Sequence, residues 1–207
     1  MKKNTGPLHC DTFYHIFNRG INRENIFKEE RNYAYFLEKY AKYVHPVAST
    51  YAFSLLKNHF HFLIRTRSEE EIKAAFTSKR EYEAGEAVSK KFSDLFNSYA
   101  QSINKEFKRT GGLFETPFRR IAVSNDEYVT QLMYYIHFNA QKHSLVDDFR
   151  CHNHSSYPIY LDNSSTFLER RLGIEWFGDV NSFITQHTEL ADERCSCIPS
   201  LLGDFEI

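Results

Sequence analysis

The chain has 207 residues, of which 42% are hydrophobic and 26% charged, ordinary values for a globular protein that exclude wholesale disorder. The length suits one medium domain with or without an appendage, and the lack of an apolar run of about 18 residues predicts no transmembrane helix. The net charge of −1 hides an asymmetry, because residues 1–121 hold 21 Lys+Arg against 14 Asp+Glu, a net of +7, whereas residues 122–207 hold 5 against 13, a net of −8.

The basic first part is compatible with a polyanionic partner, and equally with an accident of composition. The start of the sequence, MKKNTGPLHC, lacks the apolar stretch of a secretory signal. Four cysteines in a chain without such a signal (Cys10, Cys151, Cys195 and Cys197) predict reduced thiols and a cytoplasmic location.

Strand and helix periodicities alternate along the chain. Lys57 and Asn58 divide one apolar stretch into the two arms of a hairpin, and Ser124 with Glu127 has the spacing of a helix capping box. The expected elements are a strand at 13–20, a helix at 25–44, a hairpin at 51–65, a charged helix or loop at 68–90, a helix at 90–109 stopped by the glycines that follow, a strand at 118–123, a helix from 124 to about 142, a loop at 150–165 and a weak helix near 176–188. Short strands interleaved with helices favour an α+β fold, a mainly antiparallel sheet with helices packed on it.

Two histidines share one face of the strand that follows the hairpin turn. Side chains alternate along a strand, so His59 and His61 point to one side and the phenylalanines between and after them to the other. Their imidazoles can reach one ion between them. The same pattern fits a hydrogen-bonded polar pair or half of a structural zinc site, and the residues alone leave these alternatives open.

Tyr135 and Asn139 lie one turn apart on the helix predicted from 124 to 142, on a flank of its apolar stripe. We expect this flank to border the sheet without being buried, so that the phenol projects into a cleft and the amide oxygen serves as a metal ligand. A half-buried, hydrogen-bonded tyrosine is the alternative. Tyr99 is expected in the core, and Tyr134 is expected to point further from the core than Tyr135.

Other groups of histidine and cysteine are weaker candidates. Cys151, His152 and His154 stand far in sequence from Cys195 and Cys197, and the spacings do not fit a zinc finger. His137 and His143 share the helix of Tyr135. His137 lies on the opposite flank from Tyr135, which favours packing or DNA contact over metal ligation.

Several segments together resemble the single-tyrosine HUH transposases (named for a histidine–hydrophobic–histidine strand), the insertion-sequence-200-like group, and within it the REP-associated tyrosine transposases. The segments that carry the resemblance are FYHIFNRGINRENIF at 13–27, LLKNHFHFLI at 55–64, SYAQSINKEFKRTGGLFETPFRRIAV at 98–123, YYIHFNAQKH at 134–143 and HSSYPIYL at 154–161. They occur in the family's order over about residues 10–180. Ala140 stands where the family's helix usually has proline, and this departure concerns the end of that helix more than its chemistry.

The resemblance implies a ferredoxin-like HUH sheet in a catalytic domain at 1–165, followed by a helical, acidic extension at 166–207. It implies Tyr135 as the nucleophile and His59, His61 and Asn139 as ligands of Mg²⁺ or Mn²⁺, with Mn²⁺ the tighter because imidazole suits it better. It implies no other cofactor. The basic residues offered as contacts to the DNA backbone are Arg19, Lys57, Arg119 and Arg120.

The implied activity is cleavage and rejoining of single-stranded DNA at hairpin-associated sites through a covalent 5′-phosphotyrosine. A free tyrosine has a pKa near 10, and the sequence offers no dedicated base beside Tyr135. The rival reading is a domesticated relative that binds DNA hairpins without cutting. No membrane partner is expected, and the resemblance is compatible with a monomer or with a homodimer that supplies the tyrosine in trans.

Overall fold

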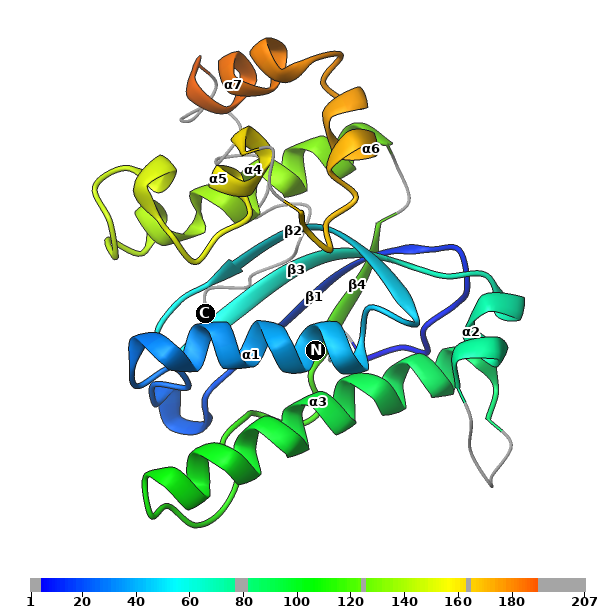
Figure 1. The fold of residues 1–207 in the computed structure, drawn as a ribbon, viewed down its shortest axis with the longest axis vertical. Helices are drawn as coiled ribbons and strands as arrows, with labels where there is room; N and C mark the ends of the chain where they lie inside the picture. The colour runs from blue at the N-terminus through cyan, green and yellow to red at the C-terminus, as the bar shows by residue number, and fades with distance from the viewer. Residues whose placement is uncertain (1–4, 77–81, 124–125, 163–164, 190–207) are drawn as a thin grey trace.

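One four-stranded sheet organises the chain, with helices on both of its faces (Figure 1). The computed structural model describes residues 5–76, 82–123, 126–162 and 165–189. The strand order is β2-β3-β1-β4, and every pairing is antiparallel, which is the ferredoxin-like arrangement. The predicted α+β class, an antiparallel sheet with helices packed on it, is therefore confirmed.

The secondary structure begins and ends as follows: β1 Phe13–Arg19, η1 Ile21–Arg23, α1 Glu30–Tyr43, β2 Ala48–Leu55, β3 His59–Thr66, α2 Glu69–Ala75, α3 Ala84–Glu106, β4 Arg119–Val123, α4 Asp126–Lys142, η2 Phe149–Cys151, α5 Tyr157–Leu161, α6 Arg170–Glu175 and α7 Val180–Glu189. In Figure 1, α1 and α3 lie on one side of the sheet, and α4 to α7 lie on the other.

Aromatic side chains fill the interface between the sheet and the layer of α1 and α3. Phe60 and Phe62 of β3 point to this side and are fully buried. Phe62 stacks on Tyr40 of α1, with ring centroids 4.3 Å apart. Tyr99 of α3 is also fully buried, and its hydroxyl donates to the carbonyl of Ile26 at 2.9 Å, so the prediction that Tyr99 belongs to the core is confirmed.

The layer of α4 to α7 is two helices deep, and this depth overturns one prediction. Tyr134 was expected to point further from the core than Tyr135, yet Tyr134 is fully buried and Tyr135 is 4% exposed. Its ring stacks on Phe138 at 5.6 Å and lies edge-on to Phe149 and His187. The outer surface of α4 is covered by η2 and α7, so this helix has little exposed surface in its central turns.

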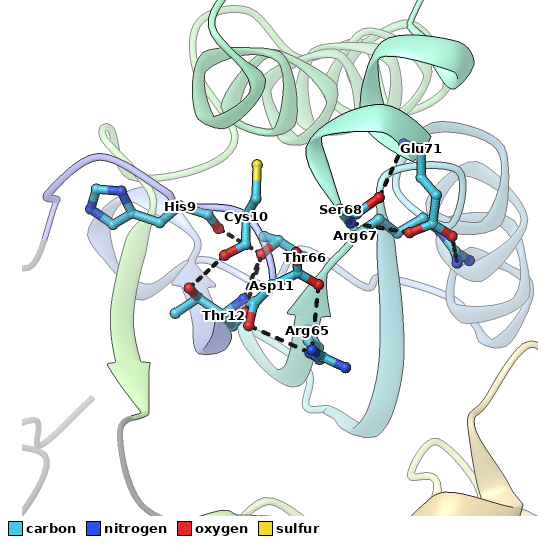
Figure 2. A network of polar contacts seen from close by, with 9 residues as sticks. All are labelled: His9, Cys10, Asp11, Thr12, Arg65, Thr66, Arg67, Ser68 and Glu71. Carbon is cyan, nitrogen blue, oxygen red and sulfur yellow. Dashed lines mark hydrogen bonds and ion pairs between the residues drawn. The ribbon is translucent and has the colours of Figure 1, made fainter.

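A polar network holds the far ends of β1 and β3 together, at the opposite end of these strands from His59 (Figure 2). The Thr66 hydroxyl donates to the carbonyl of His9 at 2.6 Å and accepts from the backbone N–H of Thr12 at 3.0 Å. Arg65 pairs with Asp11 at 3.4 Å. A shift by one residue would turn His59 and His61 to the other face, so contacts that fix the register also fix the candidate site.

Several boundaries differ from the predicted ones. The first helix begins at Glu30 and not at residue 25, because the backbone N–H groups of Ile26 and Phe27 both donate to Lys57, and Glu29 then forms a capping box with Asn32. The long helix begins at Ala84, before the predicted 90. The segment 150–165, expected as a loop, holds α5, and the weak C-terminal helix is present as α7, preceded by α6.

The capping box predicted from Ser124 and the acidic tail from residue 190 lie outside the described residues. The division at 165/166 stays a prediction. Leu168 forms a bridge with Thr50 of β2, so the chain beyond the predicted boundary packs directly on the sheet. No described helix is both long and apolar enough to cross a membrane.

Candidate active site

The two histidines of β3 lie between the sheet and α4. His59 and His61 are 3% and 1% exposed, and their ring centroids are 5.4 Å apart in an edge-on arrangement. The fully buried Phe60 between them points into the aromatic layer on the other side. The expected alternation along this strand is therefore present.

Tyr135 and Asn139 come from α4 and meet these histidines. The Tyr135 ring lies edge-on to His61, with centroids 5.8 Å apart, and Asn139 Oδ1 is 3.1 Å from His59 Nε2. The expectation that this flank would be unburied is wrong, because Tyr135 is 4% exposed and Asn139 is fully buried. The sheet and the outer helices close around α4 on both sides, so its flanks are interior.

The surroundings of His59 favour a cation between it and Asn139. His59 Nδ1 is 2.7 Å from Asn58 Oδ1, and Asn58 Nδ2 donates to the carbonyl of Arg23 at 3.3 Å. With the amide of Asn58 oriented in this way, its oxygen faces His59, and Nδ1 must be the protonated nitrogen. The lone pair of His59 Nε2 then faces the amide oxygen of Asn139, and a positive ion satisfies two such acceptors.

Unsatisfied polar atoms concentrate around His61. Among the described residues, five buried side-chain atoms have no hydrogen-bond partner, and all five belong to the neighbourhood of His61 and Tyr135: His15 Nδ1, Ser54 Oγ, His61 Nε2, Tyr128 Oη and Asn139 Nδ2. Buried polar atoms normally find partners, so a cluster of orphans indicates a place where a ligand completes the bonding.

The donor set fits a divalent ion that accepts both imidazole and oxygen. No cluster of three His, Cys, Asp or Glu side chains able to hold a metal occurs in the described parts of the chain. The predicted centre therefore depends on the amide of Asn139 for its third ligand. Rotating that amide by 180° would let Nδ2 donate to His59 Nε2, so the same residue can satisfy His59 without the ion.

Burial keeps these imidazoles neutral, which is the form that ligates metals. It lowers the pKa of His15 to about 3 and the pKa of His59 to about 4. Burial likewise holds the pKa of His61 well below its ordinary value, with a further contribution from neighbouring histidines. A site of this kind binds its ion without having to expel imidazole protons at neutral pH.

Two residues near the site, His15 and Lys142, were not singled out from the sequence, and a third, His143, was only a weaker candidate there. His15 of β1 is 1% exposed, and its Nε2 is 2.9 Å from His61 Nδ1. His143 is one turn beyond Asn139, with its ring centroid 4.9 Å from that of His59. Lys142 places its ammonium 5.1 Å from the ring centroid of Tyr135. The spacings i, i+4 and i, i+7 on α4 are the signal that could have identified the last two.

A cavity of about 320 Å³ opens beside His59 and provides a route to the site. Its lining includes the cationic side chains of Arg23 and Lys57 together with His143. Arg23 has φ of +61°, a left-handed conformation that is unfavourable for a side chain of this kind, and the amide of Asn58 bonds its carbonyl. Strain held in this way is typical of functional loops.

The four arginines and lysines predicted to bind DNA are placed differently. Arg19 and Arg119 both contact Glu115, at 2.6 Å and 3.4 Å, and Arg19 is opposite His59 in the β1–β3 register. Lys57 lines the cavity beside His59. Arg120 lies on the other face of the sheet, where its guanidinium donates to the carbonyls of residues 5 and 6 and stacks over Phe118. The structure therefore brings three of them to the histidine side and separates the fourth.

The remaining histidines on this side have packing partners. His137 is fully buried, and its Nδ1 and Nε2 lie 3.0 Å from His187 Nε2 and 2.7 Å from Ser156 Oγ. This position fits the predicted packing role. His152 Nε2 bonds the carbonyl of Leu55 at 3.1 Å, and His154 pairs with Glu30, so neither points toward a common metal position.

A scan against models of protein families finds no match, and no curated protein matches the sequence. The fold is similar to a solved structure described as a REP-associated tyrosine transposase bound to a REP hairpin. The two chains are 12% identical and superpose with a TM-score of 0.56, over 82% of this chain and 94% of that chain. At this identity the similarity establishes only the shared fold, an antiparallel sheet with helices packed on it.

Proposed function

We propose that this chain is a cytoplasmic, divalent-metal-dependent HUH tyrosine transposase that nicks and rejoins single-stranded DNA at hairpin-associated sites. The observation that carries the proposal is the meeting of β3 and α4, 80 residues apart, where Asn139 Oδ1 lies 3.1 Å from His59 Nε2 and the Tyr135 ring lies against His61. The contact of the Tyr135 ring with His61, at 5.8 Å between centroids, is made within the chain and suits a tyrosine that acts in cis.

Tyr135 is the nucleophile. After the phenol gives its proton to solvent, its oxygen forms a bond to phosphorus while the bond from phosphorus to the 3′ oxygen breaks. The leaving 3′ oxygen takes up a proton from solvent, so the products are a 5′-phosphotyrosine and a free 3′ hydroxyl. Lys142, 5.1 Å from the ring, stabilises the negative charge that develops on the phenol oxygen. The phosphotyrosine conserves the phosphodiester energy, so a 3′ hydroxyl can reverse the attack without ATP.

His59, His61 and Asn139 would hold the metal ion. Bound there, Mg²⁺ or Mn²⁺ supplies Lewis-acid polarisation of a non-bridging phosphate oxygen. Asn58 orients His59 through the bond of 2.7 Å to Nδ1. The neutral state of the imidazoles follows from their burial, and it leaves nitrogen lone pairs available as ligands at neutral pH.

A DNA hairpin is the proposed partner. The solved structure described above is a REP-associated tyrosine transposase bound to a REP hairpin, and the similarity of fold extends over most of both chains. Arg23 and Lys57 beside His59, with Arg19 and Arg119 at the neighbouring strand ends, would contact the phosphate backbone. Arg120 lies on the other face and is left out of this surface.

The test is covalent capture on single-stranded hairpin oligonucleotides taken from the flanks of the gene, with Mn²⁺ and a label 3′ of the cleavage site. We expect a protein–DNA band on a denaturing gel that is lost in Tyr135→Phe and in His61→Ala. Tyr134→Phe is the matched control, because its ring packs against Phe138 on the other side of α4. Tyr99→Phe should also retain the band.

Hairpin binding without any covalent band would favour the non-cutting DNA-binding protein instead. A band that persists in Tyr135→Phe and disappears in Tyr99→Phe would make the choice of nucleophile wrong. Mixing the Tyr135→Phe and His61→Ala variants, each inactive alone, tests the source of the tyrosine. A band restored by mixing would show that the tyrosine acts in trans.

A further inference from the structure

His15 and His61 form a buried pair across two neighbouring strands. In the β1–β3 register, His15 is opposite Leu63 and diagonal to His61 on the side of the sheet that faces α4. His15 Nε2 is 2.9 Å from His61 Nδ1, and both side chains are 1% exposed. Water does not compete for this bond, so one imidazole must donate to the other.

Counting protons gives two arrangements of the pair. If His61 donates, its Nδ1 carries the proton and its Nε2 is a free lone pair, while His15 accepts at Nε2 and carries its own proton on Nδ1. If His15 donates, the proton of His61 is on Nε2, and that nitrogen cannot bind a metal. Both arrangements hold the same number of protons, and in both the two nitrogens without a partner are His61 Nε2 and His15 Nδ1.

The corresponding bond of His59 has no such choice. Asn58 gives its amide N–H to the carbonyl of Arg23, and its oxygen can only accept from His59 Nδ1. His59 is therefore held permanently as a ligand through Nε2. His61 differs because its partner is another imidazole, which can accept or donate.

We propose that His15 is a positioning residue of the metal centre, which accepts the Nδ1–H of His61 and thereby keeps His61 Nε2 unprotonated toward the ion. The inference rests on the metal centre proposed above and extends it to a residue of β1. Outer partners of ligating histidines fix the ring nitrogen that binds, and losing them typically weakens metal affinity 10- to 100-fold. His15 Nδ1 then bears a buried proton without a protein partner, a cost that binding of the ion offsets.

Titration calorimetry with Mn²⁺ alone tests the proposal on the full chain. We expect His15→Phe, which keeps a ring of similar size, to raise the Mn²⁺ Kd about 10- to 100-fold. His15→Gln keeps an acceptor and should recover affinity to within about threefold of wild type. His154→Phe is the matched control, because it makes the same replacement at a ring that stacks on Tyr33 and pairs with Glu30, away from the proposed metal position.

The tautomer can be read directly in the unmodified chain, which keeps the proposal testable if His15→Phe fails to fold. Long-range ¹H–¹⁵N spectra of the Mg²⁺-saturated protein should show His61 protonated at Nδ1 and unprotonated at Nε2. A proton on His61 Nε2 in that state, or a His15→Phe Kd equal to wild type, would overturn the role of His15. Failure of the wild-type chain to bind Mn²⁺ at all would instead reject the metal centre itself, and His15 as part of it.

Discussion

Two buried groups of histidines flank α4, and they differ in how their nitrogens are satisfied. The site cluster, His15, His59, His61 and Asn139, leaves His61 Nε2 and two further atoms without a partner. In the clamp cluster, His137, Ser156 and His187, both nitrogens of each ring are bonded, the last of them by His187 Nδ1 to the carbonyl of Phe183 at 2.8 Å.

The two clusters are equally buried, but their hydrogen bonding predicts different roles. Both clusters are nearly or wholly inaccessible, so burial alone would assign both to the core. A buried polar atom without a partner costs about 1–3 kcal/mol, and a fold that keeps several such atoms together must recover that cost elsewhere. The proposed metal ion would recover it in the site cluster. The clamp cluster has no such cost, because its ring nitrogens are bonded, and these bonds hold α7 on α4.

The largest expected effect is on activity and comes from the site cluster. His61→Leu should reduce the covalent DNA band to the Tyr135→Phe background and abolish Mn²⁺ binding, because it removes one of three ligands. The free energy of unfolding should change by less than about 1 kcal/mol, since the lost bond to His15 is balanced by removal of the orphan at Nε2. Urea unfolding of the metal-free protein measures this, and a loss above about 3 kcal/mol would place His61 among the structural histidines.

The opposite profile is expected for the clamp cluster. His187→Leu leaves the buried His137 Nδ1 without its partner and removes the bond from His187 Nδ1 to the carbonyl of Phe183, and we expect the free energy of unfolding to fall by about 3 kcal/mol. The Mn²⁺ Kd of the folded variant should stay within about threefold of wild type. A large loss of metal affinity at unchanged stability would show that the clamp cluster acts on the ligands through α4.

Two buried serines give a smaller and chemically matched contrast. Ser156 Oγ accepts from the backbone N–H of Phe53 at 2.9 Å and contacts His137, so Ser156→Ala should cost about 2 kcal/mol. Ser54 Oγ has no partner, and Ser54→Ala should change stability by less than about 0.5 kcal/mol. Urea unfolding of both variants at pH 7.5 checks this, and equal losses would remove the distinction between the two clusters.

The strands of the sheet could be predicted from the sequence because they follow from local periodicity, and so could each half of the candidate site. Alternation on a strand places His59 and His61 together, and the i, i+4 rule places Tyr135 with Asn139. The order of strands, the register and the partners of each ring depend on contacts distant in sequence. His15 was missed for this reason, since nothing local says that β1 will lie beside β3.

The depth of the helical layer was also beyond local pattern. Tyr134 was expected further from the core than Tyr135 because the helix was treated as having one buried stripe, whereas α7 and η2 bury its outer surface as well. Arg120 is a different case, because strand alternation alone could have separated it from Arg119. It is adjacent in sequence to Arg119, and the alternation that separates the histidines from the phenylalanines also sends the two arginines to opposite faces.

The smallest predicted effect is the contribution of a single site imidazole to acid sensitivity. The pKa of His59 falls from 6.5 in the unfolded chain to about 4 in the folded protein, because burial disfavours the charged ring. Between these pH values His59 is protonated in the unfolded chain and neutral in the folded protein. The free energy of unfolding is therefore unaffected by His59 above pH 6.5 and decreases as the pH falls toward 4. From pH 6.5 to pH 5, His59 should account for about 1.5 kcal/mol of that decrease. Urea unfolding in EDTA should therefore give His59→Gln a shallower loss than wild type by this amount. Parallel curves for the two proteins would mean that His59 has the same pKa in the folded and the unfolded chain, so that burial is not what keeps this ring neutral.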